Sequence, residues 1–235
     1  MMINLDESKN LSETSEDYLK AIYDLAEEAA ATTSRLAERL GVAPATVTSM
    51  LKRLADQGWV DYRPYRGVTL TPAGREEALR LLRSHRLAET FLVEVLGLPW
   101  DQVHAEAHRW EHVISAAVLE RLDALLGHPA YDPHGDPIPS SGGDLPEMAT
   151  RRLLDVEPGS VARVERVDTQ ASDLLHYLGD LGLKPGVTVR VISVEPYGGP
   201  FTIEVGGTRH AIGREVADRV LVHLDTAQNT SVYDE

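Results

Sequence analysis

Six residues with imidazole or carboxylate side chains gather between positions 85 and 112, in two groups with helical spacing. Four of them recur at short intervals, and because successive residues of an α-helix are about 100° apart, these four project within an arc of roughly 100°. Nitrogen and oxygen ligands of this kind bind divalent first-row metals. The candidate ligands are His104, His108, Glu111 and His112 on the later segment, with His85 and Glu89 on the earlier one.

An antiparallel arrangement of these two segments across the turn at 97–99 would bring the six ligands together, enough for two adjacent metal sites. Asp17, on an earlier helical segment, could add a carboxylate and connect metal occupancy to the N-terminal part of the chain. Cysteine is absent, so a metal site must use His, Asp, Glu or carbonyl groups. Four isolated histidines are interpreted as ordinary residues without a metal role, namely His128, His134, His210 and His223.

A catalytic interpretation of the same residues fits their order less well. The later segment has the order HxxxHxxEH, whereas metallohydrolase helices carry HExxH, which places a general base beside two ligands. The chain also shows no Ser-His-Asp elbow and no phosphate-binding loop. We therefore expect a protein that is not an enzyme, with a metal-dependent hydrolase as the alternative.

Helical periodicity predicts three helices near the N-terminus, over residues 16–29, over 33–40, and from Pro44 to just before Gly58. Gly41 ends the second of these and leaves a tight turn before the third. Residues 59–71 follow as two β-prone runs around a turn that contains proline and glycine. This order predicts a winged helix-turn-helix, although helical hairpins also occur merely as packing elements.

The charge distribution supports nucleic-acid binding by this segment. The chain as a whole has a net charge of -14, but residues 35–66 contain six basic and only three acidic residues. Short side chains at the start of the second helix of such a motif approach base edges, while flanking cations contact phosphates. The candidate DNA-binding residues are Ala43, Pro44, Ala45, Thr46, Thr48, Ser49, Lys52 and Arg53 on the helix, with Arg63 and Arg66 on the wing.

The rest of the chain divides at a segment rich in proline and glycine. Helices are predicted over 72–96 and 99–126, and they are candidates for dimerisation; residues 128–147 contain five prolines and three glycines and form a linker. Short β-rich runs beyond it predict a small β-barrel. The expected domains are 1–75, 76–148 and 149–225, followed by a tail at 226–235. No signal sequence or membrane span is recognisable, so we expect a cytoplasmic protein without a membrane partner.

Together these motifs resemble the DtxR/MntR family of iron- and manganese-dependent repressors, from about Ser15 to Leu224. The likeness rests on SEDYLKAIY, VAPATVTSMLKRL, YRGVTLTPAG, HRLAE, VHAEAHRWEHVI and DPHGDPIP, which occur in the family's order. It implies a mainly α protein with a small β domain: a winged helix-turn-helix, a helical metal-binding and dimerisation domain, and a C-terminal SH3-like (FeoA-type) barrel. It also implies a homodimer that binds double-stranded operator DNA and represses metal-uptake genes when metal is plentiful.

The resemblance further implies how the ligands are shared between two sites and which metal they hold. Asp17 stands where iron-type members carry Met, and this hard carboxylate favours Mn²⁺. His108 stands where iron-type members carry Cys and manganese-type members Glu, which keeps Fe²⁺ open. A winged-helix regulator that senses an organic ligand is a further alternative, although no organic substrate is expected. The primary site would be Asp17, His108, Glu111 and His112, and the ancillary site His85, Glu89 and His104.

Overall fold

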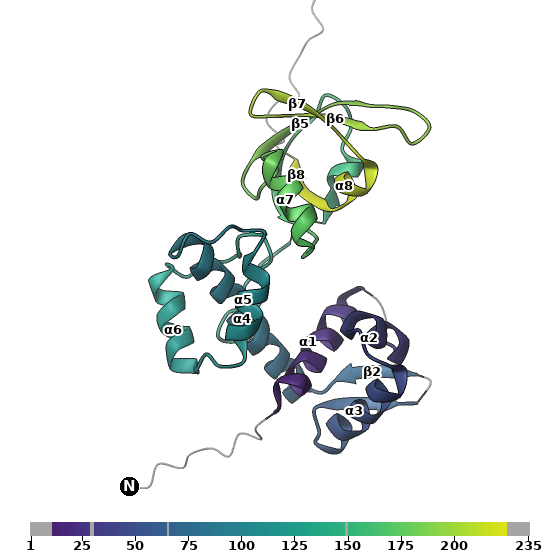
Figure 1. The fold of residues 1–235 in the computed structure, drawn as a ribbon, viewed down its shortest axis with the longest axis vertical. Coiled ribbons are helices and arrows are strands. Elements are labelled where there is room, and N and C mark those ends of the chain that lie inside the picture. Colours follow the sequence, from purple (N-terminus) through teal and green to yellow (C-terminus); the bar gives the residue numbers. More distant parts are fainter. Residues whose placement is uncertain (1–10, 29–30, 65, 149, 225–235) are drawn as a thin grey trace, which may run out of the picture. The chain divides into compact units, whose positions relative to one another are not determined.

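The computed structural model describes residues 11–28, 31–64, 66–148 and 150–224, which include every candidate site residue (Figure 1). The predicted tail at 226–235 lies outside the described residues. Contacts within the chain divide it into two units. The first unit comprises Met1–His85, Glu111–Ile114 and Pro139–Asp144, and the second comprises Arg86–Trp110, Ser115–Ile138 and Leu145–Glu235.

Three helices and a β-hairpin form the N-terminal part of the first unit. The helices are α1 (Glu13–Glu28), α2 (Thr33–Leu40) and α3 (Pro44–Asp56), and the antiparallel hairpin is β1 (Val60–Arg63) with β2 (Gly67–Leu70). The side chain of Thr32 caps α2, and Gly41 ends it in a left-handed conformation with φ 65°. The predicted helix-turn-helix and wing are therefore confirmed.

A long helix, α4 (Pro72–Glu94), begins directly after the hairpin. Its first turn lies against the hairpin backbone, because an ideal Cβ on Gly74 would be 2.0 Å from the carbonyl oxygen of Trp59. Only glycine permits this approach. The contact joins the wing to the helix that carries His85.

The sequence predicts one helix from Pro99 to about Leu126, and this prediction was wrong. The structure has two helices instead, α5 (Val103–Glu111) and α6 (Ala116–Leu125). The second starts because the Ser115 side chain accepts a hydrogen bond from the backbone N–H of Val118 and so caps a new helix. His112 consequently follows the last residue of α5 rather than lying within a helix.

The C-terminal part of the second unit contains a six-stranded sheet in the order β3-β8-β4-β5-β6-β7, with antiparallel neighbours throughout. Buried aliphatic side chains and Phe201 fill its core. The sequence predicted the main strands but not α7 (Ser172–Asp180). The remaining elements are β3 (Arg151–Arg152), the 3₁₀ turn η1 (Leu153–Asp155), β4 (Val161–Val167), β5 (Thr188–Val194), β6 (Phe201–Val205), β7 (Thr208–Ile212), α8 (Arg214–Asp218) and β8 (Val220–Leu224).

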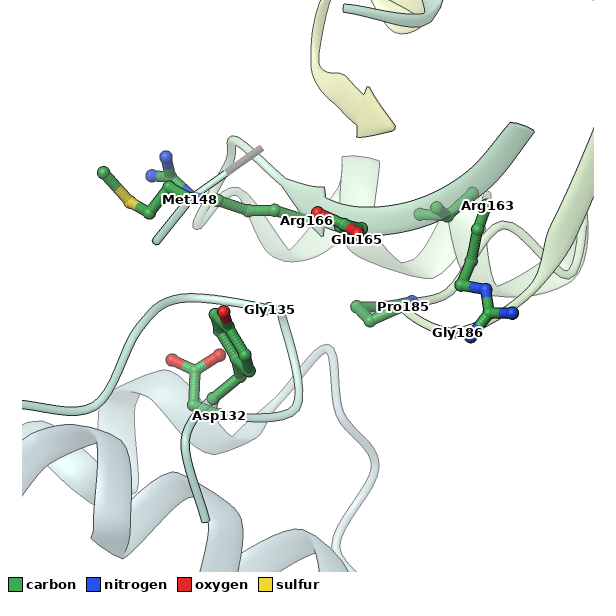
Figure 2. Close-up of a pocket in the computed structure, with 10 residues that line it drawn as sticks. Asp132, Gly135, Met148, Arg163, Glu165, Arg166, Pro185 and Gly186 are labelled. Atoms are coloured by element: carbon green, nitrogen blue, oxygen red, sulfur yellow. The ribbon is translucent and has the colours of Figure 1, made fainter. Parts of the chain in front are cut away.

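Residues 132–136 of the segment rich in proline and glycine form a loop packed on β4. The backbone N–H of Val167 donates to the carbonyl of His134 at 2.9 Å, and Arg166 Nε lies 2.6 Å from Asp136 Oδ1. Gly135 makes this packing possible, since its φ is 86° and a Cβ there would lie 1.9 Å from the carbonyl oxygen of Glu165. A cavity of about 320 Å³ opens between this loop and β4 (Figure 2).

Candidate metal centre

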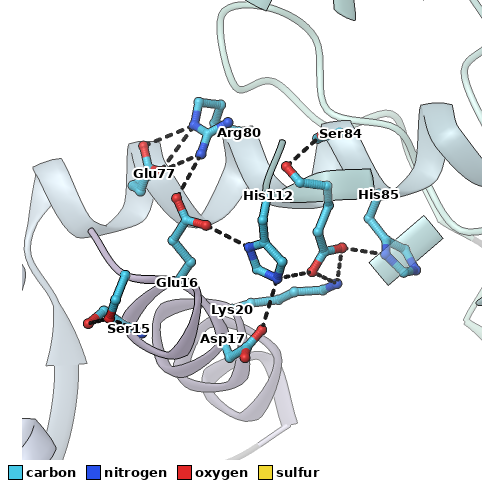
Figure 3. Close-up of polar contacts among 11 residues, drawn as sticks. Ser15, Glu16, Asp17, Lys20, Glu77, Arg80, Ser84, His85 and His112 are labelled. Carbon is cyan, nitrogen blue, oxygen red and sulfur yellow. Dashed lines mark hydrogen bonds and ion pairs between the residues drawn. The ribbon is translucent and has the colours of Figure 1, made fainter. Parts of the chain in front are cut away.

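Two carboxylates and an imidazole of the first unit converge where α1 lies beside the end of α5 (Figure 3). Asp17, Glu111 and His112 each offer one ligand atom within 4.8 Å of the others. His112 Nε2 is 3.3 Å from Asp17 Oδ1 and 3.6 Å from Glu111 Oε1. Two hard oxygen donors and one nitrogen donor suit Mn²⁺ or Fe²⁺, so the residues present fit a divalent cation.

The other nitrogen of His112 is held by a residue that the sequence analysis missed. His112 Nδ1 lies 2.6 Å from Glu16 Oε2, and Arg80 contacts the second oxygen of Glu16 at 3.2 Å. Burial raises the pKa of Glu16, although its bond to His112 and the charge of Arg80 act against this. A carboxylate in this position orients the imidazole and would direct its Nε2 toward a bound cation. Glu16 precedes Asp17 in the sequence, but nothing local indicates its partner.

Glu111 is the most enclosed carboxylate of this group, with a side chain that is 0% exposed. Lys20 Nζ lies 3.0 Å from its Oε1 and 2.7 Å from its Oε2, and His85 Nδ1 also contacts Oε2. Burial alone would raise the pKa of Glu111, but the hydrogen bond and charge of His85 and the charge of Lys20 outweigh burial and lower it to about 2. Glu111 is therefore an ionised carboxylate at neutral pH.

The other predicted ligands are placed by the helices that carry them. His108 is exposed on α5, three residues before Glu111, and belongs to the second unit. Within that unit, His104 Nδ1 lies 3.1 Å from Glu89 Oε1, so α5 presents His104 to α4 at this level. His85 is one turn before Glu89 on α4. Within the first unit, its imidazole contacts the carboxylate of Glu111.

A second buried group in the second unit involves two residues outside the predicted site. Glu89, Asp132 and His134 are each buried, and each offers a ligand atom within 4.8 Å of the others. His134 Nε2 lies 2.7 Å from the carbonyl oxygen of Trp100, whose ring stacks on the imidazole. The interpretation of His134 as an isolated residue overlooked this neighbourhood. The available signal was the acid-histidine pair within DPHGDPIP.

The charge state of this second group follows from its burial. Burial, Asp136 and Glu89 raise the pKa of Asp132 well above its usual value. Burial opposes protonation of His134, but the neighbouring acids Glu89 and Asp132 raise its pKa to about 9. A cation that binds here must therefore displace protons.

The predicted DNA-binding residues lie on the accessible side of α3 and the hairpin. Thr48 is half-buried, and its hydroxyl donates to the carbonyl of Pro44 at 3.0 Å. Arg53 Nη2 donates to Ser15 Oγ at 2.6 Å, so this side chain links α3 to α1. Contact with DNA stays a prediction for the whole set. The exposed members are Ala43, Pro44, Ala45, Thr46, Ser49, Lys52, Arg53, Arg63 and Arg66.

Comparison with known proteins matches all three parts of the chain. Residues 10–68 match the iron dependent repressor N-terminal DNA binding domain, 71–140 the iron dependent repressor metal binding and dimerisation domain, and 151–224 the FeoA domain. The iron-dependent repressor IdeR of Mycobacterium leprae (strain TN) is 38% identical over 226 residues, which cover 91% of this chain and 98% of that protein. The chain belongs to the DtxR/MntR family.

Other similar proteins include a toxin repressor and solved structures of metal-bound regulators. The diphtheria toxin repressor of Corynebacterium diphtheriae (strain ATCC 700971 / NCTC 13129 / Biotype gravis) is 42% identical over 195 residues, covering 78% of this chain and 86% of that one. A solved manganese-dependent transcriptional repressor in complex with manganese has a TM-score of 0.81 and 37% identity. The match covers 88% of this chain and 98% of that one. ScaR with bound Cd²⁺ has a TM-score of 0.75 and 33% identity, and the match covers 89% of this chain and 98% of that one.

The DtxR/MntR assignment confirms the family resemblance and the fold class predicted from the sequence. Both metals occur in the names of similar proteins, so the family by itself does not choose between Mn²⁺ and Fe²⁺. Among the described residues, no helix is long and apolar enough to cross a membrane. The ligand sets and the DNA-contacting residues stay predictions.

Proposed function

We propose that this chain is a repressor in which Mn²⁺, with Fe²⁺ as the second choice, switches a homodimer to its operator-binding form. Metal-dependent, DNA-binding repression is the function of its iron- and manganese-dependent relatives, and it is the function of this chain. The observation that carries the proposal is the convergence of Asp17, Glu111 and His112 on one point. The genes proposed to be repressed are those for metal uptake.

The proposed ligand sets follow the two groups of the sequence analysis. His108 joins the first group because it lies one helical turn before Glu111 on α5. Asp132 and His134 are additional candidates beside Glu89, because the three side chains form a buried group. The proposed primary site is Asp17, His108, Glu111 and His112, and the proposed ancillary site is His85, Glu89 and His104.

The preference for Mn²⁺ rests on ligand hardness. Asp17 and Glu111 supply carboxylate oxygens, which suit Mn²⁺, whereas soft thiolate ligands are excluded because cysteine is absent. Imidazole ligands at the same site also bind Fe²⁺, so the ligand set discriminates less strongly between the two metals. Because the affinity of a given site generally rises from Mn²⁺ to Fe²⁺, Fe²⁺ is kept as the second candidate activator.

The switch is proposed to act through α1, which carries Asp17 and packs against α2 of the helix-turn-helix. A bound cation would draw Asp17 toward Glu111 and His112 and so hold α1 in one position. Arg53 on α3 is tied to Ser15 on the same helix, which connects α1 to the DNA-reading element. A metal shifts this equilibrium only if it binds the DNA-competent form more tightly.

The proposal is tested by measuring operator affinity against buffered free Mn²⁺, Fe²⁺, Co²⁺ and Zn²⁺. The DNA is a duplex selected from a random pool with the Mn²⁺-loaded protein. We expect Mn²⁺ to strengthen binding by about tenfold or more, a typical coupling between two sites, and a chelator to reverse the gain. Binding that stays unchanged in chelator would favour a regulator that senses an organic ligand.

The wing is tested separately with Arg66→Ala. Arg66 is exposed at the hairpin turn and is proposed to contact phosphate, so its loss should weaken binding to operator and random DNA alike. The slope of log affinity against log salt concentration should fall by about one unit. Arg190→Ala, an exposed arginine on β5, is the matched control and should leave the slope unchanged. Weakening restricted to the operator would instead indicate base recognition.

A further inference from the structure

A lysine side chain reaches into the candidate metal centre from α1 (Figure 3). Its ammonium nitrogen contacts both carboxylate oxygens of Glu111, at 3.0 and 2.7 Å. The Lys20 side chain is 14% exposed and that of Glu111 is 0% exposed, so water screens this ion pair only weakly. Lys20 is three residues after Asp17 on the same helix, which places a cation and a candidate metal ligand on one face.

The ion pair matters because Glu111 is the carboxylate with the greatest need for a positive partner. A buried carboxylate is costly unless a cation or several hydrogen-bond donors compensate it. Lys20 supplies a full positive charge, and the His85 ring contacts the same oxygen, Oε2, that lies 2.7 Å from Lys20. Both oxygens of Glu111 thus already accept from groups of the protein itself.

We propose that Lys20 is an internal competitor of the metal ion, which stabilises the buried Glu111 carboxylate and thereby lowers the affinity of the site for divalent cations. A metal that binds Glu111 must share its oxygens with the Lys20 ammonium or displace it. This inference rests on the proposed function and deepens it. Lys20 is a positioning residue that sets the free metal concentration at which the sensor responds.

The direction of the effect follows from charge. A divalent ion coordinated by Glu111 would lie within a few ångströms of the Lys20 ammonium, and like charges so close repel strongly in a partly buried site. Removing the ammonium should therefore tighten metal binding, by about tenfold or more. The same change leaves a buried carboxylate without its cation, so the protein without metal should become less stable. An ordinary structural residue would not produce these two opposite changes.

The experiment compares full-length Lys20→Met and Lys20→Arg with the unmodified protein. The dissociation constant for Mn²⁺ is measured at neutral pH by competition with a fluorescent chelator, and the melting temperature is measured in EDTA. Lys20→Met should bind Mn²⁺ about tenfold more tightly or better, yet melt roughly 5 °C lower or more. Lys20→Arg keeps the charge and should stay within about threefold of the unmodified affinity. Arg190→Met, which removes an exposed cation from β5, is the control and should alter neither quantity.

Unchanged or weaker Mn²⁺ binding by Lys20→Met overturns the inference, and so does equal tightening by Lys20→Arg, because the charge would then not be the cause. If Lys20→Met does not fold, Lys20→Gln carries the same test with the same expected tightening. Failure of the unmodified protein to bind Mn²⁺ or Fe²⁺ overturns the proposed function together with this inference. Binding by the unmodified protein without tightening in the lysine variants overturns this inference alone.

Discussion

Replacing Glu111 by Gln is expected to abolish the strengthening of operator binding by Mn²⁺. The substitution keeps the size of the side chain but removes the negative charge of a carboxylate whose oxygens lie beside Lys20 and His112. An amide is a weak ligand for Mn²⁺ compared with a carboxylate, and it leaves the ammonium of Lys20 without its anion. Fluorescence anisotropy of a labelled operator, with and without Mn²⁺, measures the loss directly.

The same substitution should also destabilise the protein, by about 3 kcal/mol, because it breaks a buried ion pair. Adding Lys20→Met to Glu111→Gln removes the orphaned ammonium and should recover much of that stability without restoring the Mn²⁺ response. This double variant separates a folding defect from a lost ligand. Glu106→Gln on the outer face of α5, where Glu106 pairs with Arg109, should respond to Mn²⁺ normally. A full Mn²⁺ response in Glu111→Gln would show that Glu111 is not a ligand.

Gly135→Ala should be the most damaging small change in the second unit. The backbone φ of 86° is strained for any side chain, and the added Cβ would lie 1.9 Å from the carbonyl oxygen of Glu165. The loop must move away from β4, which breaks the bond between Val167 and His134 and the pair between Arg166 and Asp136. We expect a loss of about 3 kcal/mol or more and a melting temperature lower by roughly 5–10 °C.

Gly159→Ala is the matched control for this effect. Its φ is 88°, but nothing lies within 4 Å of its ideal Cβ, so it carries the backbone strain without the clash. It should cost only about 1–2 kcal/mol. Differential scanning calorimetry measures both variants, and hydrogen exchange of the Val167 amide reports whether the loop has left β4. Equal losses of stability in the two variants would mean that close packing of the loop on β4 does not stabilise the protein.

Local signals explain which parts of the fold could be predicted. Helix α2 was predicted with its observed bounds because a threonine cap precedes it and Gly41 follows it. The break after α5 was missed because His112, Val113 and Ile114 contain no residue that stops a helix. Ser115 can cap a new helix only where the preceding helix has already ended, so it was no signal by itself. The overlooked α7 did carry a signal, since Leu175 and Leu178 are buried at helical spacing.

Some residues of the candidate site could also be predicted from local signals, whereas others could not. Spacing along one helix pointed to Glu111 and His112, because ligand types recur at intervals that a helix converts into neighbours. The partners of these residues were not predictable, since Lys20 and Glu16 lie more than ninety positions away in the sequence. Neither carries a local pattern that names its partner. Only the packing of α1 against the end of α5 brings them together.

The early end of α5 has an electrostatic consequence of its own. A helix that ran on from Pro99 to Leu126 would pass the candidate metal centre in mid-course, whereas the observed α5 ends at Glu111. The last carbonyl groups of a helix carry the negative end of its macrodipole, so the backbone itself makes this point attractive to cations. Such an end is worth about 0.3–1 kcal/mol, less than a carboxylate ligand. The end of α5 at Glu111 therefore attracts cations through backbone carbonyl groups, and no side-chain substitution in the site removes this attraction.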